Sequence, residues 1–206
     1  DRLVVNDDVF AWDDLPNRVA VFGPGVIGLE LGQALARLGV EVRVFGMSGS
    51  LGGISDPQVR QTARKIFQRE FYLDTDARVL ETSRVGDEVE VRYVALDNSE
   101  RTERFDYALV ATGRRPNVDG LGLENTSLAL NAQGVPQFDR LTMQAGSSPI
   151  FIAGDANADA PLLHEAADEG RIAGENAARF PDVRQGLRQR GAGADLGRGR
   201  QRRALP

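Results

Sequence analysis

Apolar residues follow two different spacings along the first half of this chain. Residues 18–22 and 40–45 are short runs rich in β-branched residues, and residues 107–117 open with a third apolar run that breaks into a Gly/Pro turn. Each run predicts a strand. From Ile27 to Leu38 the apolar residues return every three or four positions, which predicts an amphipathic helix closed by Gly39. Strands alternating with helices are typical of an α/β fold around a parallel sheet.

The middle of the chain passes from a helical pattern to an alternating one. Ser55 or Asp56 is the expected cap of a helix that has Pro57 in its first turn and ends near Glu70. Turn residues then separate short runs, which predict an antiparallel meander between residues 78 and 105, inserted in the α/β domain. We expect helices on both faces of the parallel sheet. The short strands are predicted at Phe71–Leu73, Val79–Ser83, Glu88–Val94 and Thr102–Phe105.

The last third of the chain holds one more predicted strand and one more helix. The apolar run Ile150–Ala153 predicts a second buried strand, and Leu162–Arg179 has the alternation of an amphipathic helix. Residues 184–206 consist mostly of Arg, Gly, Gln and Ala without aliphatic periodicity. Such a stretch buries too little apolar surface to offset its ordering entropy. We expect it to be disordered, or not to be the natural continuation of the fold.

The first residues are predicted to be a linker. Residues 1–17 contain an acidic pair followed by Pro16, which leads directly into the first predicted strand. The chain also begins at Asp1 without a methionine. This start indicates that a segment upstream has been removed; the alternative is ordinary processing of a few residues.

Three glycines with Gly-x-Gly-x-x-Gly spacing lie between the first strand and the first helix, at Gly23, Gly25 and Gly28. In this context Gly23 would allow a tight turn, Gly25 would let a pyrophosphate approach the backbone, and Gly28 would let the helix pack close to the strand. The N–H groups and the dipole at the helix start would hold the phosphates. The pattern predicts a nucleotide site; its alternative is a plain strand-to-helix turn.

Composition narrows the classes of function. The 206 residues are 41% hydrophobic, include no cysteine and contain one histidine, His164. This excludes a disulfide framework, a redox-active thiol and a histidine-rich metal cluster in this chain. No apolar run approaches the ~20 residues that span a bilayer, and no leader pattern opens the chain. We expect a soluble, cytoplasmic protein with no membrane partner. The net charge of −5 combines +6 in residues 184–206 with −11 elsewhere, so nucleic acid is not the expected partner.

In four blocks that follow one another in a fixed order, the chain resembles the flavin-dependent pyridine nucleotide–disulfide oxidoreductases, and within them the dihydrolipoamide dehydrogenases. The blocks are Gly23–Gly39, Ala111–Asn117, Phe151–Asn157 and Leu162–Ala178. The resemblance implies a Rossmann-type NAD(P)-binding domain at residues 1–117. Residues 118–183 would be the returning segment of an FAD domain of the three-layer ββα type. The sequence would then be an internal fragment of a parent protein, a homodimer that shares FAD with a missing N-terminal domain.

The resemblance implies roles for residues around the nicotinamide dinucleotide, which the three fingerprint glycines would contact. Glu30 lies where family members hold the nicotinamide amide and a lysine near the flavin. Val26 and Ile27 lie where side chains gate the approach of the nicotinamide to the flavin ring. Gly113 ends a strand beside the bound dinucleotide, and Arg114 is assigned to the same site.

The resemblance also implies contacts with the flavin. Asp155 resembles the aspartate that hydrogen-bonds the sugar chain of the flavin. Leu162, Leu163 and His164 lie where a helix N-terminus points at the flavin pyrimidine edge. A positive helix end there would stabilise negative charge on a reduced flavin.

The position that normally selects between NAD and NADP does not decide between them in this sequence. In NAD-specific sites an acidic residue about 20 positions beyond the glycines binds the ribose hydroxyls. Here that position is Gly46, and Met47 and Ser48 provide no arginine for a 2′-phosphate. The resemblance favours NAD, with NADP as the alternative.

The catalytic part of the family pattern is absent from the sequence. There is no Cys-x4-Cys pair, no second glycine fingerprint and no interface His–Glu pair, so the chain contains no predicted catalytic residue and no metal ligand. The expected parent reaction is dihydrolipoamide plus NAD to lipoamide plus NADH, and the isolated chain should be inactive. The alternatives are another superfamily enzyme, such as an NADH oxidase, a transhydrogenase or a mercuric reductase, or a non-catalytic nicotinamide-binding module.

Overall fold

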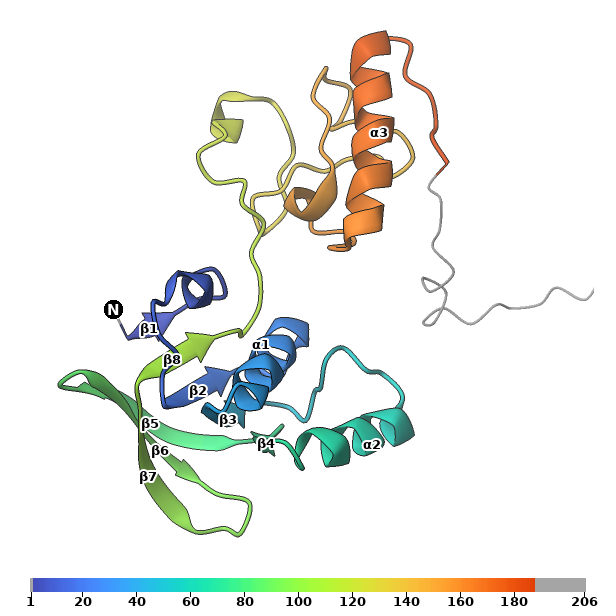
Figure 1. Ribbon diagram of the computed structural model, residues 1–206. Coiled ribbons are helices and arrows are strands. Elements are labelled where there is room, and N and C mark those ends of the chain that lie inside the picture. The colour runs from blue at the N-terminus through green and yellow to red at the C-terminus, as the bar shows by residue number, and fades with distance from the viewer. Residues whose placement is uncertain (1, 188–206) are drawn as a thin grey trace, which may run out of the picture. The chain divides into compact units, whose positions relative to one another are not determined.

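The computed structural model describes residues 2–187 (Figure 1). The chain divides into two compact units, with the boundary between Gly113 and Arg114. The sequence placed this boundary four residues later, after Asn117. Each unit is described below by itself.

The first unit is built on a five-stranded sheet in which every neighbouring pair of strands is parallel. The strand order is β1–β8–β2–β3–β4, so the strand that precedes the glycine turn lies at the centre of the sheet. Buried on both faces, this central strand is a continuous apolar run, as expected for a parallel sheet. The strands are β1 (Leu3–Val4), β2 (Arg18–Phe22), β3 (Glu41–Phe45), β4 (Tyr72–Asp74) and β8 (Tyr107–Val110).

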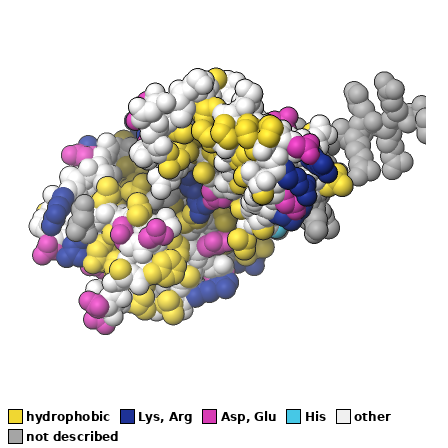
Figure 2. Space-filling model, turned by 90° about the horizontal axis from the view of Figure 1, so that it is seen from above, with side chains coloured by type: hydrophobic (Ala, Val, Ile, Leu, Met, Phe, Trp, Pro, Cys, Tyr) yellow, Lys and Arg dark blue, Asp and Glu magenta, His cyan; other side chains and the backbone are white. Residues whose placement is uncertain are grey.

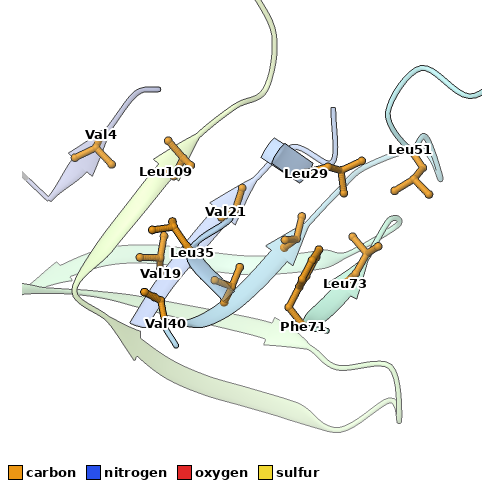
Figure 3. Close-up of a cluster of buried hydrophobic side chains, with 12 residues drawn as sticks. Val4, Val19, Val21, Leu29, Leu35, Val40, Leu51, Phe71, Leu73 and Leu109 are labelled. Carbon is orange, nitrogen blue, oxygen red and sulfur yellow. The ribbon is translucent and has the colours of Figure 1, made fainter. Parts of the chain in front are cut away.

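Helices α1 (Val26–Arg37) and α2 (Pro57–Phe67) cover one face of this sheet (Figure 1). Alternate residues of the strands point to that face and form a buried apolar cluster with α1 (Figure 3). Val21 lies opposite Val44 and Leu109 in the register of the sheet, and all three side chains are fully buried. The predicted spacing of the first helix is confirmed, because Leu29 and Leu35 belong to this cluster.

The other face of the sheet is covered by strands, which corrects the prediction of helices on both faces. The meander β5 (Arg78–Val85), β6 (Glu88–Val94) and β7 (Glu100–Phe105) forms a separate antiparallel sheet. Its inward side chains form a second apolar cluster with residues of β2, β3 and β8 in the parallel sheet. The connection from β4 to β8 thus crosses over through three strands, whose alternating pattern buries one face. The cluster contains Ala20, Phe45, Val89, Val91, Tyr93, Phe105 and Ala108.

The segment predicted as a linker belongs to the first unit. Strand β1 pairs with β8, and the Ala108 N–H donates to the Arg2 carbonyl at 2.9 Å. A 3-10 helix at Asp8–Ala11 follows, and the Trp12 ring stacks on Tyr107 with centroids 4.8 Å apart. The sequence missed this pairing because a strand of two residues has no periodicity to detect.

The second unit contains one long helix and irregular chain. Helix α3 (Leu163–Arg179) agrees with the prediction, and short 3-10 helices form at Leu123–Asn125 and Gly154–Asn157. The strand predicted at Ile150–Ala153 does not form, since only Phe151 pairs, in an isolated bridge with Gln144. A strand requires a ladder of partners, and within residues 114–187 the chain forms only isolated bridges.

The first residues of the predicted tail are packed on α3. The Asn176 amide accepts from the Arg184 N–H and donates to the Arg184 carbonyl, each at 2.8 Å. The Gly186 N–H donates to the Leu141 carbonyl at 2.8 Å. The ordered second unit therefore continues beyond residue 183. Residues 188–206, for which disorder was predicted, lie outside the described residues.

The described surface is mixed in character. On the face shown in Figure 2, acidic and basic side chains are intermixed, with apolar side chains among them. Among the described helices, none is long and apolar enough to cross a membrane.

Candidate functional site

The turn between β2 and α1 requires glycine at its first position. Gly23 has a φ of +107°, a backbone conformation that residues with a side chain rarely adopt. Its N–H donates to the Phe45 carbonyl at 2.8 Å, which ties the end of β2 to the end of β3. A Cβ atom at Gly23 would lie 2.4 Å from the Ala111 carbonyl oxygen. Both the conformation and the close contact explain the first glycine of the fingerprint.

The two other fingerprint glycines differ in the atoms that surround their Cβ positions. A Cβ atom at Gly28 would lie 1.9 Å from the Gly23 carbonyl oxygen, so Gly28 lets α1 pack directly on the turn. Gly25 caps α1 with an ordinary extended backbone, at φ −73° and ψ −178°. A Cβ atom there would meet nothing within 4 Å. The fold of this chain therefore requires Gly28 but not Gly25, and the space beside Gly25 is open.

The start of α1 presents donors and side chains at this open space. The N–H groups of the first helical turn have no partner within the helix, and the helix dipole makes this end positive. Val26 is 57% exposed, Ile27 is half-buried, and Glu30 is exposed one turn beyond Val26. Gly113, with a φ of +148°, follows β8, whose end is tied to β2 by the Ala111 N–H and the Phe22 carbonyl at 2.7 Å.

Position 46 has no room for a side chain. Gly46 is buried, and its N–H donates to the Asp74 carbonyl at 2.7 Å. A Cβ atom there would lie 2.5 Å from Cγ of Pro24 and 2.9 Å from the Thr75 carbonyl oxygen. The position where an acidic residue usually binds ribose therefore cannot carry one in this fold.

In the second unit, Asp155 lies at a cavity of about 410 Å³. Arg114 Nη1 donates to Asp155 Oδ2 at 3.0 Å, and both side chains are more than half exposed. Arg115, Asn117 and Gln133 also line the cavity. The structure thus brings together two residues that the sequence assigned to different cofactors.

A buried glutamate, which the sequence analysis missed, holds the turn that carries Asp155. Glu169 of α3 is 0% exposed, and its Oε2 accepts from the Gly154 N–H at 2.8 Å and from Asn157 Nδ2 at 2.6 Å. These two bonds join α3 to the 3-10 turn. Glu169 lies on the buried face of α3 together with Ile172. A charged residue on the apolar face of a predicted helix is the sequence signal that could have identified it as a buried hydrogen-bonding group.

The start of α3 carries the three residues that the resemblance assigned to the flavin edge. Leu162 is the N-cap, and no side chain caps the helix. Leu162 is 50% exposed, Leu163 is 89% exposed, and His164 is also exposed.

The clearest charge network of the first unit lies at the meander. Tyr93 Oη, Arg43 Nε and Arg18 Nη2 donate to the Glu103 carboxylate at 2.7, 3.0 and 2.7 Å. Burial acts to raise the pKa of Glu103, but these hydrogen bonds and the two arginine charges outweigh it and lower the pKa. Burial, followed by the bond to Glu103, raises the pKa of Tyr93. This network holds the meander on the parallel sheet. Within residues 2–187, no three His, Asp or Glu side chains gather as a metal site.

Residues 2–170 match the family model described as pyridine nucleotide-disulphide oxidoreductase. The chain belongs to this family. The mitochondrial dihydrolipoyl dehydrogenase of Caenorhabditis elegans is 34% identical over 184 residues, which cover 87% of this chain and 37% of the relative. The dihydrolipoyl dehydrogenase of Staphylococcus aureus is 31% identical over 175 residues, with 84% and 37% covered. The chain thus spans little more than a third of the length of the curated relatives it matches.

Solved structures agree with this family. LpdA from Mycobacterium tuberculosis matches with a TM-score of 0.71 and 31% identity, over 85% of this chain and 38% of that one. The flavoprotein disulfide reductase RclA from Escherichia coli matches with a TM-score of 0.76, over 90% of this chain and 41% of that one. Its identity is 19%, so this second likeness shows the fold alone. The predicted family and the predicted α/β fold are confirmed.

Proposed function

We propose that this chain supplies the nicotinamide site and part of the flavin site of an NAD-linked enzyme that oxidises dihydrolipoamide. The observation that carries the proposal is the glycine turn at the start of α1, where the fold requires Gly23 and Gly28 but leaves open space at Gly25. The dihydrolipoyl dehydrogenases among its relatives support the choice of reaction.

The first unit fits a nicotinamide dinucleotide. The open backbone at Gly25 would admit the pyrophosphate, and the N–H groups of the first turn of α1 would donate to it. Val26 and Glu30, one turn apart on the exposed face of α1, would contact the nicotinamide end. When bound, the two cofactors supply the redox chemistry: hydride moves between nicotinamide and flavin, and electrons move between flavin and a disulfide.

The second unit fits part of a flavin. Asp155 would accept a hydrogen bond from a hydroxyl of the flavin sugar chain, after its exposed pair with Arg114 has opened. Such exposed pairs contribute little stability, so opening this one costs little. The uncapped start of α3 would place its positive end toward the flavin ring.

The rest of the activity is assigned to parts that this chain does not contain. The sequence has no cysteine, so the disulfide chemistry and the remaining flavin contacts belong to other segments of the parent protein, which we propose is a cytoplasmic homodimer. The purified chain should show no lipoamide-dependent oxidation of NADH. Turnover by this chain alone would contradict the proposal that the disulfide chemistry belongs to other segments of the parent protein.

The test of the nicotinamide site is a titration of the 206-residue chain with NADH, followed by the fluorescence of the dinucleotide. Gly25→Val should abolish binding, because a side chain would fill the open space, and should lower the unfolding midpoint only by the small amount expected when valine replaces a glycine N-cap. Gly174→Ala is the matched control, since a Cβ atom there also meets nothing within 4 Å. If the unsubstituted chain does not bind NADH, or if Gly25→Val binds it equally well, the proposal is wrong.

A further inference from the structure

The proposed dinucleotide site lacks its usual acidic residue, and the inference below rests on that proposed site. Carboxylates beyond the second strand of such folds bind ribose hydroxyls and so select NAD over NADP. Gly46 occupies this position, and the contacts of its missing Cβ with Pro24 and with the Thr75 carbonyl exclude any replacement there. A carboxylate that performs this selection must come from another segment.

The segment that follows β4 runs directly alongside position 46. The Gly46 N–H donates to the Asp74 carbonyl at 2.7 Å, and the Ala77 N–H donates to the Gly46 carbonyl at 2.8 Å. The Gly49 N–H donates to the Thr75 carbonyl at 3.0 Å. These bonds fasten residues 74–77 to residues 46–49 at the carboxyl ends of the parallel strands. Ligands of open α/β sheets bind at that edge.

Asp76 carries the exposed carboxylate of this segment. Its Oδ1 accepts from the Ser48 N–H at 3.1 Å, which holds the carboxylate beside the loop that follows β3. The Asp76 N–H donates to Asp74 Oδ1 at 3.0 Å, so the backbone of the turn is also fixed. Within residues 2–187, Asp76 forms no ion pair with an arginine or a lysine.

Two other carboxylates near this loop are less available to a ligand, one because it is more buried and the other because it accepts two backbone N–H groups. Asp74 is half-buried and accepts the N–H of Asp76. Asp56 caps α2 by accepting from the N–H groups of Gln58 and Val59, at 2.8 and 2.9 Å. Residues 46–55 contain no charged side chain, so none of them could pair with a 2′-phosphate.

From this arrangement we infer that Asp76 replaces the missing acid and selects NAD. Its carboxylate accepts hydrogen bonds from the ribose hydroxyls of the adenosine half, and its negative charge repels the 2′-phosphate of NADP. Rejection of NADP by an unpaired like charge is as important as attraction of NAD. The selecting group of this chain therefore follows β4 rather than β3.

The test measures affinity for NADH and for NADPH separately, with the full 206-residue chain. The unsubstituted chain should prefer NADH. Asp76→Asn should reduce that preference about tenfold, the effect expected for one charge-assisted hydrogen bond. Asp76→Arg should reverse it. Asp87→Asn is the matched control, because Asp87 is 82% exposed at the β5–β6 turn and its loss changes the net charge equally.

The outcomes separate the two proposals. If the unsubstituted chain binds neither dinucleotide, the proposed function fails and this inference fails with it. If the chain binds NADH but Asp76→Asn leaves the ratio of the two affinities unchanged, the dinucleotide site stands and the role of Asp76 is overturned. Asp76→Asn keeps the shape of the side chain, so its ratio of NADH to NADPH affinity decides the test if Asp76→Arg does not fold. The midpoint of unfolding, followed by fluorescence of Trp12, verifies the fold of each variant.

Discussion

The two units of the chain are stabilised in different ways. In the first unit, two apolar clusters lie on opposite faces of one parallel sheet, and Val19, Val21 and Leu109 are completely buried. In the second unit, α3 buries Glu169 and Asn176, whose side chains bind the backbone of loops distant in sequence. The first unit therefore rests mainly on apolar burial, which is non-directional, whereas the second combines fewer buried apolar residues, among them Met143 and Ile172, with directional hydrogen bonds.

This difference bears on function. The open turn where we propose that a dinucleotide binds belongs to the unit with the larger apolar core, which can hold Gly23 in its left-handed conformation. The proposed flavin contacts belong to a unit that forms only isolated bridges within residues 114–187. The first unit is a candidate for independent folding, whereas the second relies on polar bonds to α3 in addition to its smaller apolar core. The following substitutions test that contrast.

The largest expected effect is loss of apolar packing in the first unit. Leu109→Ala should lower the free energy of unfolding by about 3 kcal/mol, because it leaves a cavity at a fully buried strand position. The fluorescence of Trp12, the single tryptophan, reports on this unit through its stacking on Tyr107. Leu96→Ala, at a 57% exposed turn position, should cost less than about 0.5 kcal/mol. Equal losses for the two variants would remove the argument for an apolar core.

The second effect concerns the hydrogen bonds that buried Glu169 accepts in the second unit. Glu169→Ala should destabilise that unit by about 2 kcal/mol, since it leaves the Gly154 N–H and the Asn157 amide without their acceptor. Amide hydrogen exchange at Gly154 should accelerate while the Trp12 transition stays in place. Glu169→Gln should restore protection, because its amide oxygen can accept both bonds. If Trp12 unfolding shifts as much as exchange at Gly154, the two units are not separately stabilised.

The third effect is a pH dependence confined to the first unit. Because the pKa of Glu103 is lowered from 4.5, its contribution to stability is present above that value and is lost as the pH falls through the lowered pKa. Glu103→Gln should cost about 1 to 2 kcal/mol at pH 7. Urea unfolding from pH 7 to pH 3 should show the two proteins converging at low pH. A difference that stays constant would show that the charge of Glu103 is unimportant.

The smallest effect is at a helix cap on the surface of the first unit. Asp56→Ala removes the acceptor for two N–H groups at the start of α2 and should cost about 1 kcal/mol. Asp56→Ser should recover most of that loss, because serine also caps helices. Urea unfolding measures both variants. A cost near that of Leu109→Ala would mean that α2 contributes more to this unit than its exposed surface indicates.

Much of the first unit could be predicted because its signals are local. The periodicity from Ile27 to Leu38 reports a helix with one buried face, and the Gly23 turn needs a conformation that one residue decides. The Ile150–Ala153 run shows the limit of such signals. Its apolar residues favour a strand, but pairing depends on a partner, and only Phe151 finds one.

The candidate site likewise contains residues that local sequence patterns identified and residues that only the folded structure identified. Gly23, Gly25 and Gly28 were recognised from their spacing between a predicted strand and a predicted helix, and the structure then distinguished them by the atoms that surround each Cβ position. Glu169 and Asp76 were missed. Their importance comes from backbone groups 15 and 28 residues away in the sequence, which no local pattern reveals.

The amino-acid sequence by itself determined the family, the parallel α/β core and the glycine turn, because each can be read from short blocks of consecutive residues and their order along the chain. Tertiary structure decided which layer covers the second face of the sheet and which acid supports the Asp155 turn. It also decided which carboxylate lies beside Gly46. These are contacts between distant segments, and their energies exist only once the chain has folded.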